Sequence, residues 1–283
     1  MRIDITTDAT EFRSRAGSFL LRDPLRHTVI TTSIANHVTG LDAPAEPSRF
    51  LSIHDEDDSV IGAAMRVGRR DVYLGELPPD SIAAVAAALA DVVPDSAGVE
   101  GIADDATAFA QHWCALFGTG IRQSSTTRLY ALGTLRIPDV AGNPRQAVES
   151  DIALLQAWLA AMREELEMGP GLGKAAIRRR ILAGRWWLWE RECGPVSLAA
   201  YQIPVQGWSR IGPVYTPPAA RGHGYASAVT AHVAKLLRAE GLDVCLFADT
   251  ANATATRIYR TIGFHPTHDF AHYVFDSSVS PNR

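Results

Sequence analysis

The fold is decided by the stretch Arg221-Gly222-His223-Gly224-Tyr225-Ala226, which stands between a strand pattern and a helix pattern. Residues 211–216 read as a strand, Pro217 and Pro218 end it, and from Tyr225 the apolar residues recur at helical spacing. The first N–H groups of a helix have no intrahelical partner, and the helix dipole places partial positive charge beside them. Because glycines let a ligand approach the backbone closely, the stretch predicts an anion site suited to phosphate.

The glycine spacing excludes two common phosphate loops, the dinucleotide G-x-G-x-x-G and the P-loop G-x-x-x-x-G-K-[ST]. The pattern R-x-x-G-x-A after a V-x-T-x-P strand end instead resembles the acetyl-CoA signature of the GNAT superfamily of N-acyltransferases. A second block is similar to that superfamily's second cofactor element: a strand-like run at 244–248, then Asn252, Tyr259 and Gly263-Phe264. Two blocks in the right order make the resemblance much more specific than one.

The sequence predicts one order of elements twice, and therefore two copies of an α/β fold with a mixed, mostly antiparallel sheet flanked by helices. The first copy reads as two helices within 8–38, strands at 50–53, 59–67 and 72–74, a helix at 78–92, a strand at 99–102, a helix at 104–117 and a strand at 127–132. The second reads as helices at 150–162 and 174–182, strands at 186–191, 196–203 and 208–216, the signature helix, a strand before Asp249, a helix from Asn252 and a strand at 272–275. This places a degenerate domain at 1–138 and a cofactor-binding domain at 139–283, which is the tandem arrangement known among GNAT proteins.

The first copy is degenerate at the cofactor position. Residues 74–81 hold one glycine, two prolines that donate no N–H, and two carboxylates that repel phosphate. We therefore expect one cofactor site, in the second copy.

The resemblance implies a role for each residue of the two blocks. It assigns cofactor binding through the backbone of a splayed strand end to Val214, Tyr215 and Thr216, and binding at the turn to Arg221, Gly222, His223, Gly224, Tyr225 and Ala226. Within the turn the amides of Gly222, Gly224, Tyr225 and Ala226 are expected to act, Arg221 to add charge, and the His223 side chain to face solvent. Asn252 is expected to bind the cofactor and to cap its helix, and Tyr259 to give a proton to the departing thiolate.

Composition narrows the functional class. The 283 residues are 47% hydrophobic and 20% charged with a formal charge of −4, which suits a globular protein without a basic field for nucleic acid. The three cysteines form no C-x-x-C pair, so no disulfide framework or zinc site is indicated. No apolar run is long enough to span a membrane, and Asp4, Asp8 and Glu11 do not suit a secretory signal, so we expect a cytoplasmic protein.

The sequence leaves the general base open. Some relatives place a glutamate on the strand before the Asn252 helix, whereas this chain has Cys245-Leu246-Phe247-Ala248 there. Glu190, Glu192 or a water relay remain candidates for the base. The tryptophans of 186–189 with Trp208 suit either an acceptor pocket or a core, and the histidines of 265–272 suit strands and turns better than a metal.

The resulting prediction is a transferase: an N-acetyltransferase that moves acetyl from the co-substrate acetyl-CoA to a primary amine by direct attack, without a metal. The acceptor is a small molecule or a peptide. The alternatives are an inactive acyl-CoA-binding sensor or scaffold protein, suggested by the missing glutamate, and a purely structural domain.

Overall fold

The computed structural model describes residues 1–41, 44–166 and 171–276. The chain divides into two compact units. The first unit contains Met1–Leu129, Ala248–Ala251 and the chain from Thr267 onward, and the second contains Tyr130–Phe247 and Asn252–Pro266. Each unit has the predicted α/β class, with a mixed sheet between helices.

The first unit begins with a strand that the sequence analysis did not predict. Its elements are β1 (Arg2–Thr6), α1 (Ala9–Leu20), α2 (Thr28–Val38), β2 (Arg49–His54), β3 (Val60–Arg66), β4 (Val72–Leu74), η1 (Pro79–Ser81), α3 (Ile82–Val92), β5 (Gly98–Ile102), α4 (Ala103–Phe117) and most of β6 (Gly120–Leu132). The strands follow the order β1-β2-β3-β4-β5-β12, where β12 is Phe264–Asp276. All neighbours in this series are antiparallel except β4 and β5, which are parallel.

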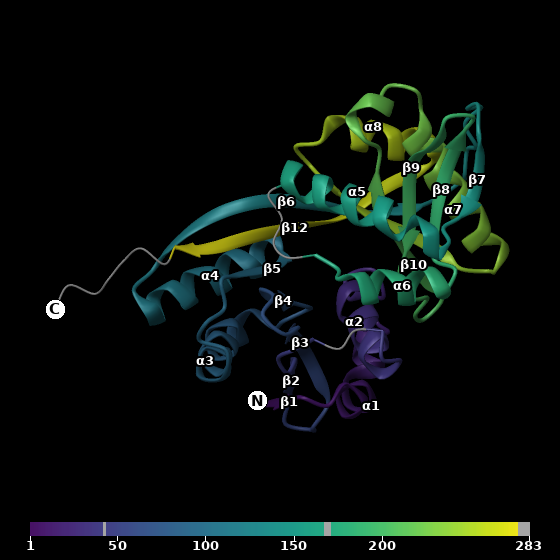
Figure 1. Ribbon diagram of the computed structural model, residues 1–283. Coiled ribbons are helices and arrows are strands. Elements are labelled where there is room, and N and C mark those ends of the chain that lie inside the picture. The colour runs from purple at the N-terminus through teal and green to yellow at the C-terminus, as the bar shows by residue number, and fades with distance from the viewer. Residues whose placement is uncertain (42–43, 167–170, 277–283) are drawn as a thin grey trace. The chain divides into compact units, whose positions relative to one another are not determined.

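Helices cover both faces of the first unit's sheet, α1 and α2 on one side and α3 and α4 on the other (Figure 1). Strand β2 shows why, because successive side chains of a strand point to opposite faces. Phe50 stacks on Phe12 of α1 with ring centroids 5.3 Å apart. Its neighbour Leu51 is buried instead in the core that contains Val85 of α3 and Phe109 of α4.

The second unit repeats this architecture. Its further elements are β7 (Asn143–Gln146), η2 (Glu149–Asp151), α5 (Ile152–Glu165), α6 (Lys174–Leu182), β8 (Trp186–Arg191), β9 (Gly194–Tyr201), β10 (Trp208–Tyr215), η3 (Pro218–Ala220), α7 (Tyr225–Ala239), β11 (Asp243–Asp249) and α8 (Ala253–Ile262). The strand order is β11-β10-β9-β8-β7, with β10 and β11 parallel. Strand β7 is an edge strand paired with β8, and the sequence analysis did not predict it.

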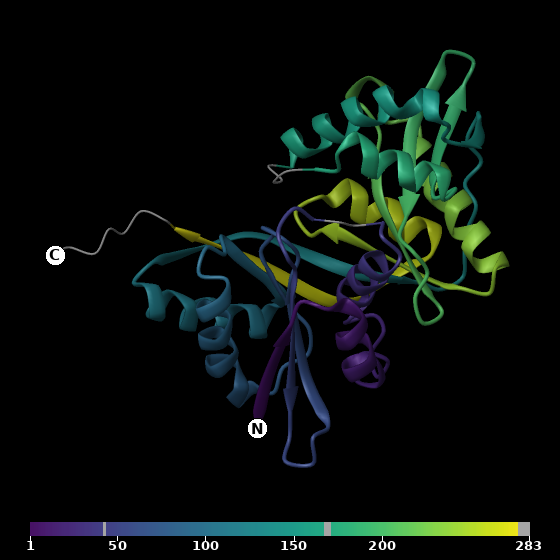
Figure 2. The ribbon, with the colours of Figure 1, turned by 60° about the horizontal axis from the view of Figure 1, so that its bottom comes forward.

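The strands of the second unit also lie between helices, with α5 and α6 on one face (Figure 2) and α7 on the other. Leu188 and Leu198 are buried in a core with Leu155 of α5 and Ile177 of α6. On the opposite face Trp187 of β8 contacts His232 of α7, with ring centroids 4.6 Å apart.

Strand β12 is much longer than the predicted strand at 272–275, and from Thr267 onward it belongs to the first unit. Phe270–Val274 pair antiparallel with Gly98–Ile102 of β5. The units therefore do not follow a single division at residue 138. The first stretch ends at Leu129, and the first unit also takes in Ala248–Ala251 and the chain from Thr267 onward.

An ion pair between His272 and Asp71 holds β12 within the first unit. His272 Nε2 lies 2.7 Å from Asp71 Oδ2, and this hydrogen bond, with Glu100 nearby, raises the pKa of His272 against the effects of burial and of Arg122. A raised folded-state pKa stabilises the fold fully below the unfolded value of about 6.5, and this stabilisation is lost as pH rises through the folded value.

We expect His272→Gln to lower the free energy of unfolding by up to about 1 kcal/mol more at acidic than at alkaline pH, since solvent partly screens the pair. Urea unfolding of both proteins at two pH values measures this. An equal loss at both would show that the ion pair contributes nothing.

Candidate functional site

Strands β10 and β11 part halfway along their length. Their parallel pairing ends at Ile211 and Leu246, whereas β10 continues with β9 through Val214 and Tyr215. The register between β10 and β9 shifts between Ile211 and Val214, which bends β10 at this point. The edge of β10 that faces β11 is therefore free of ladder bonds along Val214 and Tyr215, as the resemblance predicted for a splayed strand end.

The turn after β10 presents unused backbone donors. Among the described residues, none accepts a hydrogen bond from the N–H groups of 222–227, and α7 has no side-chain cap. Gly222 and Gly224 have φ of +83° and +80°, a region that favours glycine. No heavy atom of the described residues lies within 4 Å of the position that a Cβ on Gly222 would take. A cluster of free amides beside open space at a helix start fits a phosphate group.

The predicted residue Arg221 is already engaged. Its guanidinium donates to Glu165 Oε2 at 2.5 Å and to the carbonyl of Thr216 at 2.9 Å. Tyr215 donates its hydroxyl to Glu165 Oε1 at 2.9 Å, so one carboxylate at the end of α5 holds two predicted site residues. Arg221 therefore braces the strand end against α5, and its charge is largely matched by Glu165.

Glu165 was missed by the sequence analysis, because a glutamate at the end of a helix carries no signal of its own. The hydrogen bond from Arg221 and then that from Tyr215 lower the pKa of Glu165. A carboxylate held in this way is a weak proton acceptor, so Glu165 does not fill the place of the missing base. Ser197 was also missed; its hydroxyl lies 3.1 Å from the Tyr215 carbonyl and 2.8 Å from the Thr216 hydroxyl.

His223 is exposed, as expected, and its ring stacks on that of Tyr225 with centroids 5.5 Å apart. Its Nδ1 lies 2.8 Å from the Arg221 carbonyl. The side chain thus stiffens the turn on its solvent side and leaves the amides of the turn open.

Helix α8 carries the second predicted block and packs against α7. The predicted cap is confirmed, since Asn252 Oδ1 accepts a hydrogen bond from the Ala255 N–H at 2.9 Å. Tyr259 is buried against Phe264, and burial raises the pKa of Tyr259 to about 12. Burial is the sole cause of this shift, and no hydrogen bond of the Tyr259 hydroxyl is found among the described residues.

The equivalent position of the first unit is closed. The N–H of Gly75 donates to Ala63 at 2.8 Å, and the N–H of Glu76 donates to His27 Nε2 at 3.1 Å. Leu77 is buried, and a Cβ on Gly75 would lie 2.9 Å from the Ala63 carbonyl oxygen. These two amides are already bonded within the first unit, unlike the amides of the turn at 222–227.

Two sets of residues whose role the sequence left open, a candidate base and the tryptophan run, make contacts within the second unit. Glu190 accepts a hydrogen bond from Arg145 at 3.0 Å. Trp186 and Trp189 are buried, and the Trp189 indole donates to the Ala141 carbonyl at 3.1 Å, so this part of the tryptophan run belongs to the core. Over the described ranges no group of three or more histidine, cysteine or acidic side chains could hold a metal. No helix in the described part of the chain is long and apolar enough to span a membrane.

Comparison with known proteins agrees with this geometry. Residues 190–273 match the model of the FR47-like protein family. No curated protein matches the chain in sequence.

Several solved structures are similar to the chain over nearly its whole length. A GNAT-family acetyltransferase from Colwellia psychrerythraea is 11% identical, with a TM-score of 0.59 over 98% of this chain and 100% of its own. A GCN5-related N-acetyltransferase from Sphaerobacter thermophilus is 20% identical, with a TM-score of 0.58 over 85% and 84%. A tandem GNAT protein from the clavulanic acid biosynthesis pathway is 10% identical, with a TM-score of 0.58 over 99% and 100%. The predicted resemblance is confirmed at the level of the fold: the chain has the GNAT acetyltransferase fold in its tandem form.

Proposed function

We propose that the protein is an N-acetyltransferase that transfers the acetyl group of acetyl-CoA to a primary amine, through one site in the second unit. The observation that carries the proposal is the pairing of a parted strand end with a turn whose amides are unused. Acetyl-CoA would supply an activated thioester at this site. Backbone amides and carbonyls along Val214–Thr216 would hold its arm and orient the thioester, and the amides of Gly222–Ala226 would hold its diphosphate.

The residues of the second unit then have distinct tasks. The hydrogen bonds of Glu165 with Arg221 and Tyr215 would hold the strand end in place. This matters because a small displacement of the reacting groups lowers the reaction rate strongly. The attacking amine forms a C–N bond to the acetyl carbon as the C–S bond breaks, and the Tyr259 hydroxyl would give its proton to the thiolate. The surplus proton on the amine nitrogen would leave to water, and the Tyr259 phenolate would regain a proton from water. Asn252 would fix the start of α8 and thereby the direction of Tyr259.

A panel of amines tests the proposal. Full-length protein with acetyl-CoA should release free CoA with at least one class of amine, among small amines, amino sugars, polyamines and peptides with free N-termini. Release should depend on both substrates, and the product should be the N-acetyl amine by mass. Tight binding of acetyl-CoA without turnover on any amine would instead favour the inactive acyl-CoA sensor, and no binding would leave a structural role.

A further inference from the structure

The first unit contains a cavity of about 530 Å³ on the α1 side of its sheet. It is lined by Arg2, Asp4, Arg15, Ser18, Phe19, Arg22, His54, Asp58, Ser59 and Val60. All of these residues belong to α1, β1, the β2–β3 hairpin or the turn after α1, so the cavity lies within one unit. Its volume falls in the range typical of small-molecule sites.

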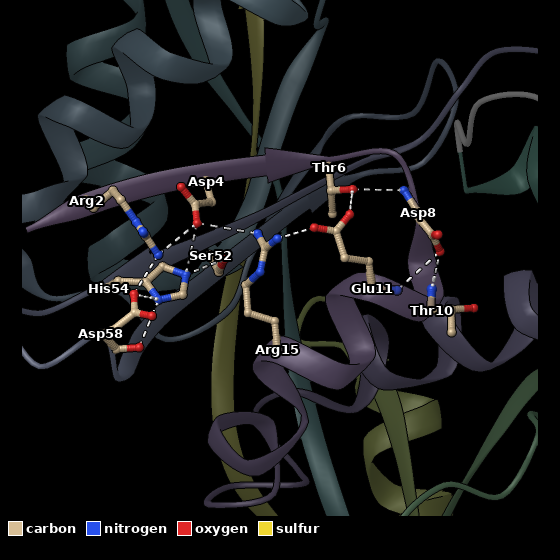
Figure 3. A network of polar contacts seen from close by, with 10 residues as sticks. All are labelled: Arg2, Asp4, Thr6, Asp8, Thr10, Glu11, Arg15, Ser52, His54 and Asp58. Atoms are coloured by element: carbon tan, nitrogen blue, oxygen red, sulfur yellow. Dashed lines mark hydrogen bonds and ion pairs between the residues drawn. The ribbon is translucent and has the colours of Figure 1, made fainter.

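The inner wall of the cavity is fixed by a polar network, shown in Figure 3. Asp4 lies at its centre, with Oδ2 3.1 Å from Arg2, 3.6 Å from Arg15 and 3.6 Å from His54 Nε2. His54 is only 3% exposed, and its ring is held between the Ser52 hydroxyl at 3.0 Å and the Asp58 carbonyl at 3.1 Å. Since Ser52 is itself fully buried, this serine–histidine–aspartate set cannot act on a substrate, and it serves to hold the wall rigid.

Two of the three arginines that line the cavity are closely paired with carboxylates. Arg2 lies against Asp4 and Asp58, and Arg15 lies against Asp4 and Glu11. Arg22 is the least neutralised of the three, because its nearest carboxylate, Glu76, is 3.8 Å away and its side chain is 60% exposed. Its guanidinium is nevertheless positioned, lying 5.2 Å from the centre of the Phe19 ring.

Asp58 places its own carboxylate at the mouth of the cavity. Its carboxylate lies 2.6 Å from Arg2, although the side chain is 73% exposed and the backbone holds φ of +65°. A non-glycine residue in this region costs about 1–2 kcal/mol. Asp58 therefore places a carboxylate beside Arg2 from a strained turn, in a position that a ligand carboxylate or phosphate can share or take.

We propose that this cavity binds a small molecule that carries a carboxylate or a phosphate on an apolar body. Arg22 and Arg2 bind the oxyanion, and Phe19 and Val60 contact the apolar part. The site is independent of acyl transfer and gives the first unit, whose cofactor position is closed, a ligand of its own.

Benzoate and phenyl phosphate are suitable probes, titrated by calorimetry into the full-length protein and into its Gly224→Glu variant. Gly224→Glu blocks the amides of α7, the other place where an anion is expected, so binding that survives it belongs to the cavity. Arg22→Gln should weaken this binding by about tenfold, the worth of one charge-assisted hydrogen bond. Asp58→Asn should strengthen it by about threefold, because a competing carboxylate is removed.

Arg69→Gln is the matched control, since Arg69 is an exposed arginine of the same unit that lies outside the lining. It should leave the affinity unchanged, whichever of the two probes binds more tightly. The proposal is overturned if neither probe binds at millimolar concentration, if Arg22→Gln has no more effect than Arg69→Gln, or if Gly224→Glu alone removes binding. The acetyltransferase assay plays no part in this test, so either proposal can fail without the other.

Discussion

Gly224→Glu is expected to abolish acetyl-CoA binding, with a loss of affinity of at least about a hundredfold. Gly224 caps α7 with φ of +80°, and a Cβ there would lie 3.0 Å from Val140 Cγ2. The new side chain would therefore be strained, and its carboxylate would stand where a diphosphate must approach the amides. Calorimetric titration with acetyl-CoA measures the loss, and retained micromolar affinity would refute the assignment.

Two further glycines separate loss of the ligand site from damage to the helix. Gly222 has φ of +83° and Gly241 has φ of +77°, and a Cβ on either meets no heavy atom within 4 Å. They flank opposite ends of α7, so Gly222→Glu and Gly241→Glu impose similar backbone strain at different places. We expect Gly222→Glu to lose acetyl-CoA binding and Gly241→Glu to keep it. Loss in both would show that strain in α7, and not the blocked amides, is responsible.

The tandem fold was predictable because its signals are local. The turn at 221–226 and the short apolar runs of strands such as β3 and β9 are properties of neighbouring residues, and they fix element type and order. The Asn252 cap was predictable for the same reason, since its bond spans only three residues.

What the sequence did not reveal depends on distant parts of the chain. Strand β12 continues into the first unit because Phe270–Val274 find partners about 170 residues earlier, and no local pattern states that pairing. Strand β7 was not predicted because Pro144 is unusual in a strand, yet an edge strand tolerates proline. Strand β1 was missed for another reason: Ile3 and Ile5 alternate with polar residues there, but the run is only five residues long.

The candidate site likewise combines local features, which were predictable, with contacts between distant residues, which were not. The backbone donors of the turn were expected from the glycines, whereas the engagement of Arg221 by Glu165 joins positions 56 residues apart. The resemblance implied that Arg221 adds charge at the turn, and in the structure its guanidinium is paired with Glu165. The cavity beside α1 had no sequence signal either, because its arginines and carboxylates read separately as ordinary surface charge.

Tyr259→Phe is expected to lower kcat by roughly a hundredfold while changing acetyl-CoA affinity less than about twofold. The substitution removes only a hydroxyl and keeps the ring packed against Phe264. Tyr130→Phe, a buried tyrosine of the same unit outside α8, is the control and should keep full activity. Equal losses of turnover and of cofactor affinity would assign Tyr259 to packing.

The pH dependence sharpens this assignment. Burial raises the pKa of Tyr259 to about 12, so the phenol stays protonated through the neutral and mildly alkaline range. A donor must be protonated to act, and the amine must be deprotonated to attack, so kcat/KM should rise with pH to a plateau and stay level up to about pH 10. A fall on the alkaline side that disappears in Tyr259→Phe would mean that the phenol titrates much lower than its burial implies. If kcat/KM of Tyr259→Phe instead rises with pH in the same way but lies a hundredfold lower, the hydroxyl is the group that protonates the departing sulfur. The group that titrates would then be the amine in both proteins.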